Sequence, residues 1–117
     1  IKIETCNIRV TDSNACELFG KCDVVCEAFD SPQAKAMLVN VLLQNCPEVK
    51  IVSGSGMAGL SSSNLIRTTR KVKNLYVCGD QQSEAKQGNG LMAPRVQICA
   101  GHQSNMVLRL LTGTEDV

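Results

Sequence analysis

A short apolar run turns directly into an apolar helical pattern at residues 23–40, whose sequence is DVVCEAFDSPQAKAMLVN. The run predicts a strand over 23–29, apolar on both faces as in the centre of a parallel sheet. A helix over 31–46 follows, with a proline suited to its first turn and with Asp30 or Ser31 as its cap. Such a strand and helix form one half of a βαβ unit, whose ligands bind outside the carboxyl ends of the strands. Asp30 lies at that position, so it is either a helix cap or a ligand.

The remaining pattern extends this unit into a mixed α/β sheet. A strand over 49–53 comes after a helix, so it is parallel to the first strand. Two further strands, over 64–69 and 75–78, are joined by too few residues for a crossover helix, and they therefore form an antiparallel pair. The pattern also predicts a strand over 2–10, a short helix over 15–19 that ends at Gly20, and a final helix over 94–112 with Gly113 as its C-terminal cap.

Length and composition exclude several classes of protein. With 117 residues the chain forms one domain at most, and 44% of its residues are apolar but only 3% are aromatic. The core is therefore aliphatic, and stacking of nucleic acid bases on aromatic side chains is not expected. A net charge of +1 provides no general attraction to nucleic acid or to a membrane surface. No apolar run reaches the roughly 20 residues of a membrane span, and no signal peptide is visible.

Two glycine-bearing loops follow predicted strands. The loop 54–59 has the spacing G-x-G-x-x-G, but no helical pattern follows it, as a dinucleotide fingerprint requires. We interpret it as a flexible or closely packed loop near the site. The loop Gly79–Gly90 is polar and has no apolar rhythm. A loop of this kind between packed elements is typical of a functional segment.

The seven cysteines are interpreted as reduced thiols of a cytoplasmic protein, most of them buried, because most lie in apolar patterns such as Tyr76-Val77-Cys78. Zinc is not expected, since no Cys-x-x-Cys pair exists and His102 is the single histidine. No nucleophile is visibly paired with His102, so a structural or exposed histidine is favoured over a catalytic one. A basic cluster over 67–73 is either a solvated sheet edge or a docking surface for an acidic partner.

The helix over 31–46 carries more apolar residues than one buried face requires. Its two apolar faces consist of Ala34, Met37, Leu38, Val41 and Leu42, and of Ala36, Val39 and Leu43. The second face should be covered by another helix of the chain or by a second subunit. A homodimer is therefore one of two alternatives.

Five ordered stretches resemble the C-terminal half of the ThiF/MoeB/HesA family, the bacterial relatives of ubiquitin-activating enzymes. They are CDVVCEAFD, SPQAKAMLVNVLL, VSGSGMAGLSSSN, YVCGDQQSEAKQGNGLMAPRV and QICAGHQSNMVLRLL, and together they cover nearly the whole chain. The short ThiF-like branch matches best. The resemblance implies a Rossmann-like mixed sheet with covering helices. It also implies that residues 1–117 are the C-terminal part of a single ThiF-like domain, with the ATP-binding loop upstream.

The resemblance further implies an activity for the intact protein. Such adenylyltransferases use ATP and magnesium to adenylate the C-terminal glycine of a ubiquitin-like sulfur carrier, as in thiamin thiazole synthesis. Asp30 occupies the place of the family's magnesium-binding aspartate, and a hard cation does prefer carboxylate oxygens. Lys35 stands where relatives carry a basic residue, as a phosphate neighbour or a salt-bridge partner. The residues expected to border the channel for the carrier's tail are Gly54, Gly56, Met57, Gly59, Gly79, Asp80 and Gly90.

Three departures from the family pattern leave alternatives open. The ATP loop is missing from residues 1–117, so these residues are not expected to be active by themselves. The zinc-binding Cys-x-x-Cys motifs of longer relatives are missing, and the loop that carries a reactive thiol in some members has no cysteine here. One alternative is therefore a non-catalytic binding or dimerisation module of the same fold. A half of an NAD(P)-linked oxidoreductase is another, on fold analogy alone.

Overall fold

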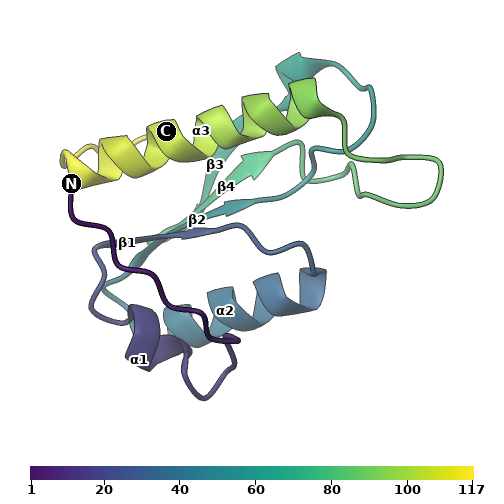
Figure 1. The fold of residues 1–117 in the computed structure, drawn as a ribbon. Coiled ribbons are helices and arrows are strands. Elements are labelled where there is room, and N and C mark those ends of the chain that lie inside the picture. The colour runs from purple at the N-terminus through teal and green to yellow at the C-terminus, as the bar shows by residue number, and fades with distance from the viewer.

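A four-stranded mixed sheet separates two layers of helices in the computed structural model, which describes all residues 1–117 (Figure 1). The sheet has the strand order β1-β2-β4-β3. Its strands are β1 (Val24–Glu27), β2 (Lys50–Gly54), β3 (Arg67–Val72) and β4 (Leu75–Gly79). The strands β1, β2 and β4 are parallel, and β3 pairs antiparallel with β4. The predicted parallel strands with an antiparallel extension are therefore confirmed, as is the α/β fold class.

The helices lie close to their predicted positions. They are α1 (Ala15–Phe19), α2 (Pro32–Asn45) and α3 (Ala93–Leu111), with a short 3₁₀ helix η1 (Ser63–Leu65) before β3. Ser31 is the cap of α2, because its Oγ accepts a hydrogen bond from the Ala34 N–H at 3.2 Å. The helix α3 ends before Gly113, whose φ of +87° suits glycine at this position.

Two apolar clusters hold the helices on opposite faces of the sheet, and Figure 1 shows α3 on one side with α1 and α2 on the other. The cluster under α3 contains Val52, Ile66, Tyr76, Cys78, Cys99, Met106 and Leu110. The cluster under α1 and α2 contains Ala15, Val25, Leu38, Leu42, Val49 and Ile51. The helix α1 packs against α2, so part of the surplus apolar surface of α2 is covered within the chain. A homodimer stays a prediction.

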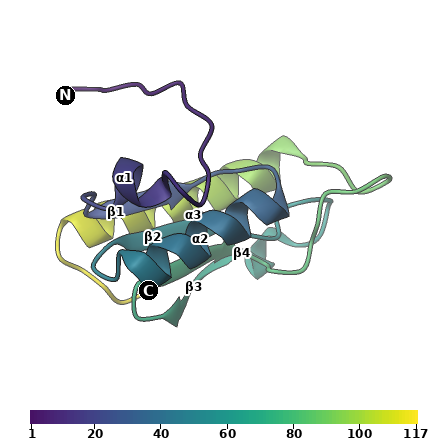
Figure 2. The same cartoon turned by 90° about the horizontal axis from the view of Figure 1, so that it is seen from below.

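Three predictions about the sheet differ from the structure. Residues 2–10 form no strand and leave the molecule as an extended segment, seen in Figure 2, because no neighbouring strand is available to pair with them. The strand β1 lies at an edge of the sheet rather than at its centre, so Cys26 faces solvent. The strand predicted over 64–69 begins later, at Arg67, because η1 occupies the preceding residues.

The burial of the thiols also differs from prediction. Only Cys78 and Cys99 are buried, whereas Cys6, Cys22 and Cys26 are exposed and the others are half-buried. Gly101 lies inside α3, and its surroundings are open, since a Cβ there would have no heavy atom within 4 Å.

Candidate functional site

The candidate site lies at the edge of the sheet where the three parallel strands end. The last residues of these strands are Glu27, Gly54 and Gly79. Because β1, β2 and β4 are parallel, the turn into α2 and both glycine-bearing loops start from this one edge (Figure 1). The sequence-predicted residues are therefore brought to a common region of the molecule.

Glu27 is a fully buried carboxylate at the end of β1, with a side-chain exposure of 0%. Its Oε2 accepts hydrogen bonds from Lys35 Nζ at 2.6 Å and from Ser53 Oγ at 2.5 Å. Its Oε1 accepts one from the Phe29 N–H at 2.5 Å. A buried carboxylate requires such partners, because its desolvation is otherwise very unfavourable. The group therefore fastens β1, β2 and α2 together directly beneath the turn that carries Asp30.

Sequence reasoning missed Glu27, although a signal was available. An acidic residue inside an apolar strand pattern needs a cation nearby, and Lys35 follows eight residues later. The structure gives Lys35 the role of a salt-bridge partner, with its side chain 25% exposed. A contact between Lys35 and a phosphate stays a prediction.

Gln103 adds a second missed contact at this edge. Its Nε2 donates a hydrogen bond to the main-chain oxygen of Glu27 at 3.1 Å. Its Oε1 would lie only 3.1 Å from a Cβ at Gly54. Gln103 therefore connects α3 to the ends of β1 and β2, and Gly54 leaves room for its side chain.

Asp30 is exposed and makes neither a hydrogen bond nor an ion pair through its carboxylate. Ser31 performs the capping role, so the carboxylate of Asp30 remains available at the start of α2. Carboxylate oxygens suit magnesium, which takes one or two carboxylates from protein and its other ligands from phosphates and water. No three side chains of His, Cys, Asp or Glu cluster in the structure as a ready metal site. Asp30 thus fits a magnesium ion only as a single protein ligand.

Asp80 is committed to a buried ion pair rather than presented to a ligand. Its Oδ2 lies 2.8 Å from Arg95 Nη2, and the two side chains are only 6% and 5% exposed. Its Oδ1 accepts from the main-chain N–H groups of Gln82 and Ser83 at 2.9 and 2.8 Å. Burial alone would raise the pKa of Asp80, but hydrogen bonds from Ser83 and Arg95 outweigh it and hold that pKa well below its usual range. Arg95 also donates to the Ala58 main-chain oxygen.

The two glycine-bearing loops interlock through their main chains. The Asp80 N–H donates to the Gly56 oxygen at 2.8 Å, and the Gln81 N–H donates to the Ser55 oxygen at 3.0 Å. Gly79 has a φ of +135°, and a Cβ there would lie 1.8 Å from the Ser55 oxygen. Of the two interpretations of loop 54–59, the structure therefore supports close packing.

The other loop candidates contribute to the same contact. The Gly59 N–H donates to the Gly90 oxygen at 2.9 Å, which joins the far ends of the two loops. Met57 is half-buried and packs against the cluster under α3. The sequence-predicted loop residues therefore build one rigid wall beside the strand ends, while Asp30 lies apart from them on the β1 side.

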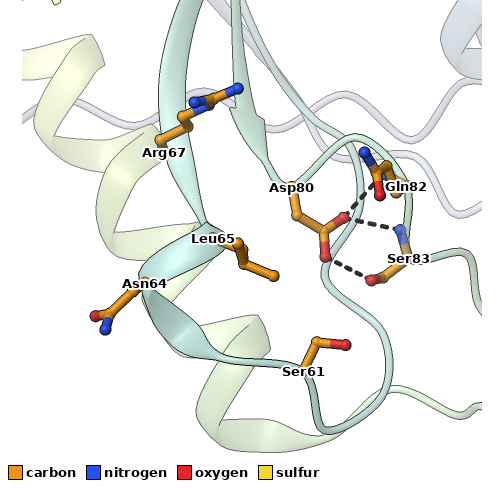
Figure 3. A pocket seen from close by; sticks show the side chains of 7 residues that line it. All are labelled: Ser61, Asn64, Leu65, Arg67, Asp80, Gln82 and Ser83. Carbon is orange, nitrogen blue, oxygen red and sulfur yellow. Dashed lines mark hydrogen bonds between the residues drawn. The ribbon is translucent and has the colours of Figure 1, made fainter.

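A polar hollow of about 210 Å³ adjoins this wall on the β3 side. In Figure 3 it lies between the segment from Ser61 to Arg67 and the loop that carries Asp80. Its lining residues are Ser61, Asn64, Leu65, Arg67, Asp80, Gln82 and Ser83. Arg67 is exposed and makes no ion pair, so it is the free cation at this hollow.

His102 belongs to a hydrogen-bonded chain that ends on a buried thiol. Its Nδ1 lies 3.0 Å from Thr68 Oγ1, which in turn lies 3.5 Å from Cys78 Sγ. Burial raises the pKa of the Cys78 thiol, so this sulfur is not an activated nucleophile. The arrangement favours the structural interpretation of His102, and the predicted burial of Cys78 is confirmed.

The basic cluster lies on the edge strand β3 and on the turn after it. Arg70 already has partners, because its Nη2 contacts Glu115 Oε2 at 3.2 Å and its guanidinium lies 5.3 Å from the ring centre of Tyr76. Arg67, Lys71 and Lys73 are exposed. Exposure fits both a solvated sheet edge and a docking surface, so the choice between these two interpretations stays a prediction.

These features define an α/β protein of Rossmann-like architecture, with its candidate site at the carboxyl edge of the parallel strands. A family model described as the ThiF family matches residues 1–117, and the chain belongs to that family. Comparisons with curated proteins and with solved structures gave no match. Membership confirms the resemblance and indicates an adenylyltransferase of the ubiquitin-activating kind, whose relatives typically act with ubiquitin-like partners. None of the helices combines the length and apolar character that a membrane crossing requires.

Proposed function

We propose that this chain is part of an ATP-dependent adenylyltransferase that activates the C-terminus of a ubiquitin-like sulfur carrier, as in thiamin-type sulfur transfer. The observation that carries the proposal is the exposed, unpartnered carboxylate of Asp30 beside the first turn of α2. Membership of the ThiF family supports the class of reaction. Catalysis of this kind rests on positioning and on neutralising charge at phosphate, and it requires no protein nucleophile.

In this proposal Asp30 contributes one oxygen ligand to magnesium, which neutralises negative charge on the ATP phosphates when bound. Glu27 holds the turn below it, because its Oε1 accepts from the Phe29 N–H and its Oε2 is paired with Lys35. The amino end of α2 adds a favourable field for phosphate. Residues of this chain thus orient one side of the nucleotide site.

The carrier's extended tail is proposed to run along the wall formed by loops 54–59 and 79–90. The wall is fixed in place by the Asp80–Arg95 pair, so it offers a preformed surface rather than a mobile one. A homodimer, with a second copy covering the remaining apolar surface of α2, is part of the same proposal.

The direct test is Asp30→Asn in the intact protein, assayed by ATP–pyrophosphate exchange with the carrier present. We expect a loss of roughly 100-fold or more in exchange, with a raised magnesium requirement and an unchanged melting temperature. Asp23→Asn is the matched control, because Asp23 is also exposed but lies at the opposite end of β1. Unchanged exchange in Asp30→Asn would contradict the proposal. An intact wild-type protein that binds the carrier without any exchange would favour the non-catalytic module.

A further inference from the structure

Two half-buried thiols are in direct contact at the end of the molecule that lies away from the candidate site. Cys16 belongs to α1 and Cys46 is the C-terminal cap of α2, thirty positions later. Their Sγ atoms lie 2.7 Å apart. A disulfide bond is about 2.05 Å long, so the two sulfurs need to approach by only about 0.7 Å to form one.

The local packing directs these two side chains toward each other. Both thiols pack against the apolar cluster under α1 and α2. Gly20 ends α1 beside them, and a Cβ there would lie 3.2 Å from Cys46 Sγ and 2.5 Å from the main-chain oxygen of Cys16. Glycine therefore keeps open the space through which Cys46 reaches Cys16.

No other thiols of the chain are placed in this way. Cys78 and Cys99 are buried, and burial raises the pKa of Cys99 to about 11, which suppresses its reactive thiolate. Cys6, Cys22 and Cys26 are exposed, but none of them contacts another sulfur. The Cys16–Cys46 contact is thus the one sulfur–sulfur contact in the chain, and it remains open to small oxidants.

We propose that Cys16 and Cys46 form a redox-sensitive pair that hydrogen peroxide converts into an intramolecular disulfide, fastening α1 to the end of α2. In the first step the thiolate of one of the two cysteines attacks a peroxide oxygen and the O–O bond breaks, which gives a sulfenic acid and hydroxide, and the hydroxide takes up the proton that this thiol lost. The other thiol then attacks the sulfenic sulfur, the S–O bond breaks and water leaves. Two thiols are oxidised, and one peroxide is reduced to two waters.

The direct contact between the thiols serves either order of these steps. Whichever sulfur is oxidised first, its partner lies within reach to attack it. The helix α1 is only five residues long and has no side-chain cap, so a covalent tie restrains a weakly held element.

The test uses the full protein with Cys6→Ser, Cys22→Ser and Cys26→Ser, which removes the exposed thiols that can cross-link molecules. Treatment with a small excess of hydrogen peroxide should give a mass loss of about 2 Da and a peptide linking Cys16 to Cys46. The melting temperature should rise by roughly 10 °C and return after reduction with dithiothreitol. Adding Cys16→Ser or Cys46→Ser should abolish both the mass loss and the thermal shift.

Several results would overturn the inference. One is oxygen addition at Cys16 or Cys46 without a linkage, and another is a linkage between other cysteines. A third is a disulfide-linked protein whose melting temperature does not change, because the disulfide then does not restrain α1. If a serine variant fails to fold, peptide mapping of the oxidised wild-type chain shows instead whether Cys16 is linked to Cys46.

Discussion

Replacing Asp80 by asparagine should destabilise the protein strongly, although the change removes little more than a charge. The carboxylate lies 2.8 Å from Arg95, and both side chains are about 95% buried, since their exposures are 6% and 5%. The variant leaves the Arg95 guanidinium buried without a counter-charge, and breaking a buried pair in this way costs about 3–5 kcal/mol. We expect about 3 kcal/mol, because asparagine still accepts hydrogen bonds from the backbone at Gln82 and Ser83.

Urea unfolding followed by circular dichroism measures this effect, as a lower midpoint with an unchanged slope. Asp116→Asn is the matched control, because Asp116 also pairs with an arginine, at 2.9 Å, but its side chain is 79% exposed. That variant should lose less than about 1 kcal/mol. Equal small losses in the two variants would refute the argument from burial.

The same pair predicts a pH dependence with a definite sign. The folded-state pKa of Asp80 lies well below its usual range, whereas the unfolded value is about 3.9. Its stabilisation is therefore fully present above the unfolded pKa and is lost as the pH falls toward the folded one. The stability difference between wild type and Asp80→Asn should be constant near neutral pH and should shrink below about pH 4. A difference that stays constant down to pH 3 would contradict the assigned cause.

Two further pairs of substitutions test the packing around the site. Gly101→Ala should stabilise the protein by up to about 1 kcal/mol, because the surroundings of Gly101 are open. Gly79→Ala should destabilise it by about 3 kcal/mol or more, because a Cβ at Gly79 would meet the Ser55 oxygen. Thermal unfolding of both variants checks these opposite effects on the melting temperature. Lys35→Met should destabilise the protein more than Glu27→Gln does. Lys35→Met leaves the Glu27 carboxylate, which is 0% exposed, without a counter-charge. Glu27→Gln leaves the Lys35 ammonium group, whose side chain is 25% exposed, free to turn toward water. The reverse order in urea unfolding would contradict the assigned burial.

Local sequence patterns determined most of the secondary structure. The strand-to-helix switch at 23–40, the proline at the start of α2 and Gly113 after α3 each act through the chemistry of a few neighbouring residues. The predicted strand over 2–10 fails for a different reason. Its pattern is compatible with a strand, but a strand needs a partner, and none lies beside this segment in the structure. The edge position of β1 likewise depends on pairing rather than on its apolar run.

The sequence alone placed Asp30 beyond a strand end and the two glycine-bearing loops near it, because the carboxyl ends of parallel strands meet at one edge. Only the tertiary structure decided what these residues contact. It made Ser31 the cap of α2 and left the Asp30 carboxylate without a partner. It also paired Asp80 with Arg95, fifteen positions away. It also brought Cys16 and Cys46 together across thirty positions. Charge pairing and thiol contact depend on distances of a few ångströms between distant segments, and those distances are set by how the helices pack on the sheet.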